Sequence, residues 1–298
     1  MTSQGRPRPE APPGAAGGAG GGAAPRGRLR LRFRRDPAGA TYLAEQRAGY
    51  PFHLCRPHRY DGDPDGMATL YVQSVAGGLY DGDDLVLGAT VERGAAVHLT
   101  TQAATIVHAT PTAPARHGAT LSAGTEGFVE YLPDATILFP AARLDAGLSI
   151  TADDGAVVVA GDSFLTHDPE GRGRAFGWIR GAVEVRRRDG RLLFADRYQL
   201  AGEDWARRLP GVSAGRGGQG MLLVLHPGLA PEALVEGLRA ALHGQSDLYA
   251  GASTLPNGCG AWARLLAPDG APLRAGLLAA WSAVRTLITG VPPRPRRK

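Results

Sequence analysis

Short stretches in which apolar and polar residues alternate run through most of the chain. Alternation with a period of two puts apolar side chains on one face of a strand and polar side chains on the other. The sequence Leu-Arg-Leu-Arg-Phe at 29–33 therefore predicts a strand whose arginines lie in water. Strands at 70–74, 85–91 and 95–101 follow, separated by glycine-rich turns. Glycine suits such turns because a reversing chain needs positive φ, which glycine adopts without a steric clash.

The same pattern predicts further strands at 41–46, 119–123, 127–132, 136–139, 148–151, 156–160, 178–186, 192–200, 221–225 and 261–266. The tripeptide Arg188-Asp189-Gly190 predicts a hairpin between two of them. Helical spacing occurs in two late segments, at 231–243 and 271–288, each followed by glycine. The sequence therefore predicts a mainly β protein with two late α-helices.

Composition and charge limit the classes of protein. Of the 298 residues 43% are hydrophobic and 20% charged, and no apolar run approaches the roughly 18 residues of a transmembrane helix. The N-terminus lacks the apolar region of a signal peptide, so we expect a cytoplasmic protein with no membrane partner. Residues 1–27 are rich in glycine, proline and arginine, and 291–298 are basic. Both are predicted to be disordered tails around one domain at 28–290.

The net charge of +5 does not indicate nucleic-acid binding. The two tails hold seven of the 33 basic residues and one of the 28 acidic residues, so residues 28–290 have a net charge of −1. The only lysine, Lys298, is too close to the end to serve a phosphate-binding loop or a Schiff base. The two cysteines, Cys55 and Cys259, are far apart and do not form a zinc site. Gly215–Gly220 matches GxGxxG but precedes a strand, which excludes a dinucleotide fingerprint.

Three groups of polar residues are candidates for chemistry. Asp81-Gly82-Asp83-Asp84 is rich in carboxylates, but its composition is that of a turn more than of a tight metal site. His98 and His108 lie on or beside strands, where a lone histidine is more often structural. A β-fold hydrolase could use His167, Asp168 and Ser163, although Asp-Pro-Glu-Gly at 168–171 favours a turn. A small-ligand or metal-binding module acting alone is a further alternative.

Several segments in a fixed order resemble the family of urease accessory proteins called UreD, or UreH in some systems. The segments are Arg56-Pro57, the stretch from Leu70-Tyr71 to Gly77–Asp83, Thr100–Thr105, Glu130–Asp134 with Phe139–Ala141, Asp162–Phe164, Asp196-Arg197 and Leu248–Ser253. Together they span most of residues 28–290. The resemblance implies a β-helical arrangement of stacked sheets in a single domain.

The resemblance also implies the function. It suggests a non-enzymatic chaperone or scaffold for urease maturation, which acts with UreF, through a large apolar surface, and with the GTPase UreG. Together these proteins would insert nickel into apo-urease, with nickel passing through a polar internal channel. Weak, exchangeable oxygen ligands suit such a channel, because a cluster of histidines and cysteines would bind nickel too tightly to release it.

The residues that the resemblance places along this transient nickel conduit are Asp83, Thr105, Asp162 and Asp196, with Glu130 and Glu184 as further members. No catalytic residue and no permanently bound cofactor is expected. The nearest alternative remains the hydrolase centred on His167 and Asp168.

Overall fold

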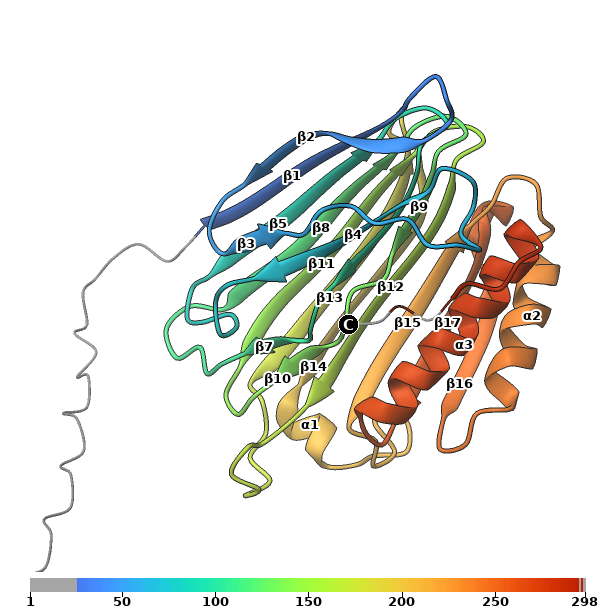
Figure 1. The fold of residues 1–298 in the computed structure, drawn as a ribbon. Coiled ribbons are helices and arrows are strands. Elements are labelled where there is room, and N and C mark those ends of the chain that lie inside the picture. The colour runs from blue at the N-terminus through green and yellow to red at the C-terminus, as the bar shows by residue number, and fades with distance from the viewer. Residues whose placement is uncertain (1–25, 295, 297–298) are drawn as a thin grey trace, which may run out of the picture.

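The computed structural model describes residues 26–294 and 296. Two β-sheets are stacked face to face, and helices cover the outer side of one of them (Figure 1). Within the described residues, sheet A has seven strands in the order β14 (Leu192–Ala201), β13 (Trp178–Arg187), β11 (Arg143–Ala152), β8 (Ala115–Ala123), β5 (Asp84–Val91), β1 (Arg26–Arg35) and β2 (Thr41–Ala48).

Sheet B lies face to face with sheet A. Its main path is β16 (Tyr249–Thr254), β17 (Gly260–Ala267), β15 (Gly218–Leu225), β12 (Val157–Thr166), β9 (Phe128–Tyr131), β6 (Ala96–Thr101), β4 (Ala68–Ser74) and β3 (Phe52–Leu54). Two short strands, β7 (Thr105–Val107) and β10 (Thr136–Leu138), extend it beside β12.

The chain coils between the sheets. From β4 to β13 most successive strands alternate between B and A, and neighbours such as β5 and β8 or β9 and β12 pair in parallel. Each coil adds one strand to each sheet, which is a β-solenoid-like arrangement. The predicted stacked, mainly β fold is therefore confirmed.

Alternation along β1 follows the prediction. Leu29, Leu31 and Phe33 are buried, whereas the arginines between them are exposed. The Asp-Gly turn at 189–190 joins β13 and β14 as an antiparallel pair, as predicted. Turn glycines Gly82 and Gly94 have φ of 76° and 65°, values that an L-residue with a Cβ rarely adopts.

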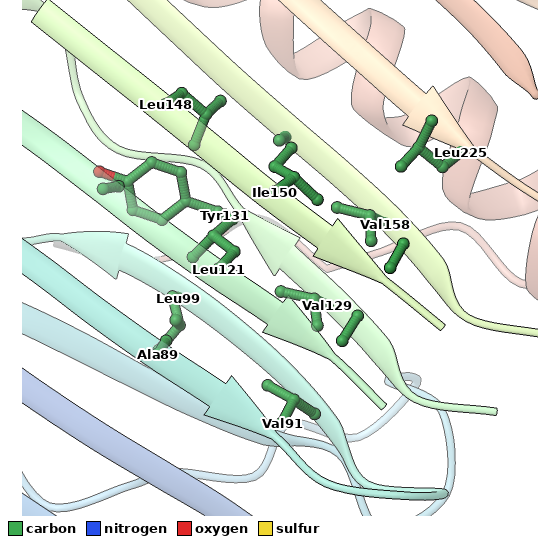
Figure 2. Packing of buried hydrophobic residues seen from close by; sticks show 14 of the residues in the cluster. Ala89, Val91, Leu99, Leu121, Val129, Tyr131, Leu148, Ile150, Val158 and Leu225 are labelled. Carbon is green, nitrogen blue, oxygen red and sulfur yellow. The ribbon is translucent and has the colours of Figure 1, made fainter. Parts of the chain in front are cut away.

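The inner faces of the two sheets form one large core (Figure 2). Figure 2 shows members from both sheets, namely Ala89, Val91, Leu121, Leu148 and Ile150 from sheet A, and Leu99, Val129, Tyr131, Val158 and Leu225 from sheet B. A smaller core lies toward the other end of the strands and includes Ala115, Leu144, Phe164, Phe176, Ile179 and Trp205. Burial of these side chains supplies the main stabilisation of the fold.

Helices α2 (Pro231–His243) and α3 (Gly270–Thr289) lie side by side over β15, β16 and β17 (Figure 1). The Asp269 carboxylate accepts the Ala271 N–H at 2.9 Å and caps α3, and Gly290 ends it with φ of 75°. The apolar sides of both helices form a third core on the outer face of sheet B. Sheet A has no such cover among the described residues.

The structure differs from the sequence prediction in three elements. Helix α1 (Gly202–Ala206) is one turn long and β7 has three residues, so neither shows a periodicity. Strand β16 reads Tyr-Ala-Gly-Ala-Ser-Thr and lacks the β-branched core residues of a typical strand. The described part of the chain therefore has three α-helices, two of them late.

The terminal segments are described only in part. The predicted disorder of residues 1–27 concerns mostly residues outside the described range, but Arg26 and Gly27 already belong to β1. At the other end the structure corrects the prediction of a solvated tail at Arg296. Its side chain is 6% exposed and pairs with Asp63. No helix of the described residues is long and apolar enough to cross a membrane.

Candidate functional site

The space between the sheets is not apolar along its whole length. Strand β8 contributes Ala119 to the large core and Ala115 to the small core, with His117 between them. Strand β12 contributes Ala160 and Phe164 to the two cores, with Asp162 between them. Because alternate residues of a strand face the same side, both His117 and Asp162 point into the interior.

Strand register places these residues in one row of each sheet, and the Arg264 guanidinium of sheet B lies 5.8 Å from the Tyr198 ring centroid of sheet A. We call the two rows together the middle layer. On sheet A its paired members are His117, Ala146, Gly181 and Tyr198. On sheet B they are Asp162, Met221 and Arg264. Apart from Met221 and from Leu85, the register partner of His117, which belong to the two cores, the middle layer places small and polar side chains between two apolar cores.

Asp162 has the most unusual environment of this layer. Burial raises the pKa of its carboxyl above the usual range, and a hydrogen bond from the Ser163 backbone offsets only part of that effect. Its charge in turn helps to raise the pKa of the Tyr131 and Tyr198 hydroxyls, which burial already raises. Within the described residues Asp162 makes no ion pair. A carboxylate kept in an interior without a cationic partner costs stability.

Asp162 also lines, at its position between Gly161 and Ser163, a cavity of about 650 Å³ between sheet B and α3, on the side of sheet B away from its inward-pointing side chain. His98, Thr100 and Ser163 contribute to the lining of that cavity. The residue as a whole is partly buried, but its carboxyl group faces the space between the two sheets. The cavity under α3 is therefore a separate feature from the middle layer.

Asp196 lies at one edge of the middle layer. It is the register partner of Val183 on the neighbouring strand, faces the interior, and forms an ion pair with Arg264 of the other sheet. The Arg264 guanidinium lies 4.8 Å from the ring centroid of Trp262 and 5.8 Å from that of Tyr198. Both Asp162 and Asp196 act on the Tyr198 hydroxyl. The structure therefore brings these two predicted conduit residues into one neighbourhood.

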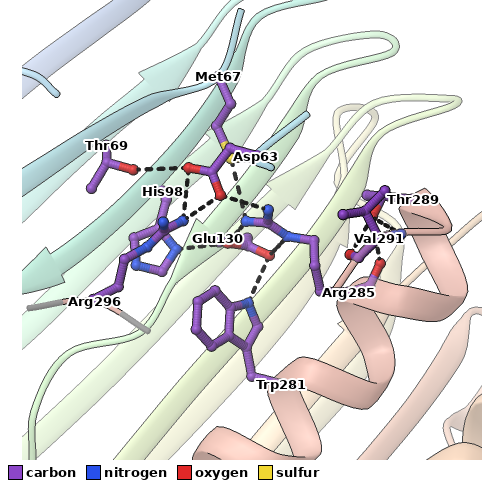
Figure 3. Close-up of polar contacts among 10 residues, drawn as sticks. All are labelled: Asp63, Met67, Thr69, His98, Glu130, Trp281, Arg285, Thr289, Val291 and Arg296. Atoms are coloured by element: carbon purple, nitrogen blue, oxygen red, sulfur yellow. Dashed lines mark hydrogen bonds and ion pairs between the residues drawn. The ribbon is translucent and has the colours of Figure 1, made fainter. Parts of the chain in front are cut away.

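Glu130 is also buried, but it points away from the middle layer toward α3 (Figure 3). Its carboxylate accepts hydrogen bonds from Trp281 Nε1 at 2.8 Å, Arg285 Nε at 2.7 Å and His98 Nδ1 at 2.6 Å, and a second bond from Arg285. The Arg285 side chain is fully buried. This buried ionic network fastens α3 to the outer face of β9.

The network continues to a loop and to the C-terminal segment. Arg285 Nη1 donates to Asp63 at 3.0 Å, and Arg296 Nη2 donates to both oxygens of Asp63 at 2.7 and 2.8 Å. Arg296 also lies 4.7 Å from the Tyr60 ring centroid. Two buried cations and two buried carboxylates therefore neutralise each other.

Burial alone would raise the pKa of Glu130, but the hydrogen bonds from His98 and Arg285 lower it to about 2. An ionised Glu130 requires that His98 Nδ1 carries a proton, and burial lowers the pKa of His98. His98 is thus the neutral, hydrogen-bonded structural histidine that its place on a strand predicted.

This network predicts an acid-labile fold. A carboxyl whose pKa falls from 4.5 to about 2 on folding stabilises the native state by about 3 kcal/mol above pH 4.5, and this contribution is lost between pH 4.5 and 2. Urea unfolding of the wild type should show that loss. The double variant Glu130→Met/Arg285→Met should lose less stability across the same window, and equal losses would contradict the assignment.

The other predicted conduit residues lie outside the middle layer. The Asp83 carboxylate accepts the Tyr80 N–H at 2.8 Å and orders the turn before β5. Thr105 begins β7 and pairs with Thr136 of β10, the neighbour of β12. Glu184 lies on the outer face of sheet A, where it pairs with Arg186 and Arg197. The structure does not bring these three residues, or Glu130, together with Asp162.

The hydrolase residues do not form a triad. The Asp168 carboxylate accepts the backbone N–H groups of Glu170, Arg172 and Arg174 and the Arg174 side chain, and Arg174 holds the pKa of Asp168 well below its usual range. Within the described residues no hydrogen bond joins His167 to Asp168 or Ser163. Asp168 therefore orders its own loop.

Sequence analysis missed Arg285, Trp281 and the interior role of His117. Trp281 and Arg285 are four residues apart on the predicted apolar stripe of α3, so they share one face. An arginine on that stripe was a signal for a buried ion pair. For His117 the signal was its place between alternating apolar positions. The predicted strand began only at residue 119, whereas β8 begins at Ala115 and includes His117.

No three side chains of histidine, cysteine, aspartate or glutamate gather around one point among the described residues. The donors that are present are the isolated carboxylate of Asp162, the imidazole of His117 and nearby hydroxyls. Burial lowers the pKa of His117, which favours its neutral, ligating form. Such an arrangement offers weak and exchangeable ligation.

Comparison with known proteins gives a consistent result. A family model described as "UreD urease accessory protein" matches residues 25–298. The chain is 41% identical over 268 residues to urease accessory protein UreD 1 of Pseudomonas syringae pv. syringae, covering 90% of this chain and 94% of that protein. It is 38% identical to UreD 1 of Methylorubrum populi, with 87% and 88% covered, and 34% identical to UreD 2 of Streptomyces griseus, with 87% and 89% covered.

Proposed function

Because the chain belongs to the UreD family of urease accessory proteins, we propose that it is a non-enzymatic scaffold for urease maturation. In this proposal it acts in the cytoplasm with UreF and the GTPase UreG and enables nickel insertion into apo-urease. The names of its relatives support an accessory role. The location and the partners rest on the predictions made from the sequence.

The observation that carries the conduit part of the proposal is Asp162. A carboxylate between two apolar cores, with a pKa raised by burial, lowers the stability of the fold. Sequences keep such groups where function requires them. Here the function would be brief ligation of nickel on its way through the interior.

The middle layer suggests how nickel would be held and released. Nickel would be the cargo, and Asp162 would supply a charged oxygen ligand beside the Tyr198 and Tyr131 hydroxyls. Neutral His117 would add one nitrogen ligand in the same layer. A site with few mixed ligands exchanges its metal more readily than a cluster of histidines and cysteines, so the ion could move on. Asp196, held by Arg264, would mark the edge of the route.

The apolar surface predicted for UreF has a candidate on the helical side. Leu278 and Leu287 of α3 and Val291 after it are each more than 40% exposed. Exposed apolar residues of this kind favour a protein interface. We therefore assign UreF to the α3 side of the molecule.

The proposal is tested in cells that express urease with UreF and UreG, with and without this chain. We expect nickel-free, inactive urease only when the chain is absent. Urease that matures equally well without the chain would overturn the proposal. A His167→Ala variant should support maturation as the wild type does, whereas its complete failure with partner binding intact would favour the hydrolase alternative.

A further inference from the structure

The outer face of sheet A is open although most of its strands are parallel. Parallel sheets are usually covered on both faces, and here the helices lie on sheet B (Figure 1). Most outward residues of sheet A are charged or small, for example Arg116, Gly118 and Thr120 along β8, and the exposed Tyr42 and Leu192 are exceptions near its edges. This face is therefore adapted to water or to a polar partner.

The charges on this face are arranged in two levels. Eight arginines share five carboxylates there, and every arginine is more exposed than the carboxylate that it contacts. The arginine side chains are 44% to 75% exposed and the carboxylates 22% to 38%. The carboxylates are Glu45, Asp84, Glu92, Asp145 and Glu184. A partner approaching this face therefore meets guanidinium groups first.

A groove crosses the middle of this face. Val86, Gly118, Gly147 and Ala182 are register partners in one row, with Arg28 and Arg197 at its two ends. The short side chains of this row leave a depression of about 640 Å³, with Arg116 and Arg180 along one wall. Protruding acidic side chains would fit between these arginines, since guanidinium groups bind carboxylates in a bidentate manner.

The face also contains an unfavourable contact. Arg30 lies directly opposite Arg47 in the β1–β2 pair, and like charges at such positions are destabilising. Arg30 makes no ion pair within the described part of the chain. Residues 28–290 together have a net charge of −1, so the excess of arginine here is a local feature. An acidic partner would relieve the repulsion between Arg30 and Arg47.

We propose that the outer face of sheet A is the surface that docks apo-urease, through an acidic patch on the urease subunits. This inference rests on the proposed function and adds the surface and the chemistry of the contact. The interspersed carboxylates favour a protein of mixed charge over a nucleic acid, whose phosphates would meet all five of them. The face lies on the opposite side of the molecule from α3, so UreF and urease could bind together.

The test compares two matched triple variants in the full complex with UreF and UreG. Arg116→Gln/Arg180→Gln/Arg197→Gln neutralises groove arginines that are 49% to 66% exposed. Arg93→Gln/Arg172→Gln/Arg207→Gln neutralises three ion-paired arginines elsewhere that are 65% to 77% exposed. Purified apo-urease is the probe, at about 0.15 M salt. We expect the groove variant to weaken binding at least about tenfold and the control less than about twofold. Wild-type binding should weaken with salt more steeply than that of the groove variant.

A second variant distinguishes a loss of binding from a loss of folding in the groove variant. Arg30→Glu should stabilise the isolated chain by pairing with Arg47, and should still weaken urease binding. If the groove variant and Arg30→Glu both bind urease as tightly as the wild type, the docking surface is wrong. The proposed function would still stand, because the wild type binds urease. Failure of the wild type to bind or mature urease would instead overturn the proposed function. Displacement of urease by a short DNA duplex at equal charge would show a nucleic-acid surface and also overturn the inference.

Discussion

Replacing Glu130 with glutamine is expected to leave little folded protein. The substitution removes the carboxylate that pairs with Arg285 through Nε and Nη2, and Arg285 is fully buried. Breaking a buried ion pair from one side costs about 3–5 kcal/mol, because a charge stays in the interior without compensation. That is a large part of the total of about 5–15 kcal/mol that stabilises a typical domain. Soluble yield and urea midpoint measure the effect.

The double variant Glu130→Met/Arg285→Met is the control for this prediction. Removing both charges leaves no unpaired ion, since Asp63 keeps Arg296 as its partner. Replacement of a buried pair by apolar residues of similar volume is often neutral or stabilising, but here the Trp281 and His98 N–H groups also lose their acceptor. The double variant should therefore regain part of the lost stability. Equal instability of the single and double variants would show that the network stabilises by packing and not by charge.

The same network shows where sequence reasoning succeeds and where it stops. The α3 segment was predictable because its apolar residues recur at helical spacing and Gly290 ends it. Its contact with Glu130 was not, because 155 residues separate Glu130 from Arg285. Alternation tells which residues of a strand share a face, but it does not tell which distant strand or helix lies against that face.

The candidate site shows the same division. Resemblance identified Asp162 and Asp196, and the structure places both in or beside the middle layer. The resemblance could not show that the Glu130 and Glu184 side chains point away from the middle layer, because successive residues of a strand face opposite sides of the sheet. His117 was predictable only with the register of β8 and β11, which pairs it with Ala146. The conduit role of all these residues stays a prediction.

Replacing Asp162 with asparagine is expected to stabilise the protein and to impair urease maturation. The folded pKa of Asp162 is raised by burial, so the native state retains a proton that the unfolded chain releases as the pH rises above about 3.8. The cost of the ionised carboxylate is therefore absent below about pH 3.8, grows as the pH rises toward the folded pKa, and is complete above that pKa. Removing the carboxylate should therefore raise stability near pH 7, and the urea midpoint measures this gain.

Asp196→Asn is the matched comparison, since Asp196 is the other predicted conduit carboxylate of this neighbourhood. It pairs with the partly exposed Arg264, so its replacement should lower stability by about 1 kcal/mol, while both variants should yield urease with less nickel. Opposite effects on stability with the same effect on nickel would separate conduit function from folding. If Asp162→Asn stabilises the chain and urease still receives its full nickel, the carboxylate does not ligate the ion in transit. A stability cost that a sequence could remove with one substitution is best explained by a function that requires the charge.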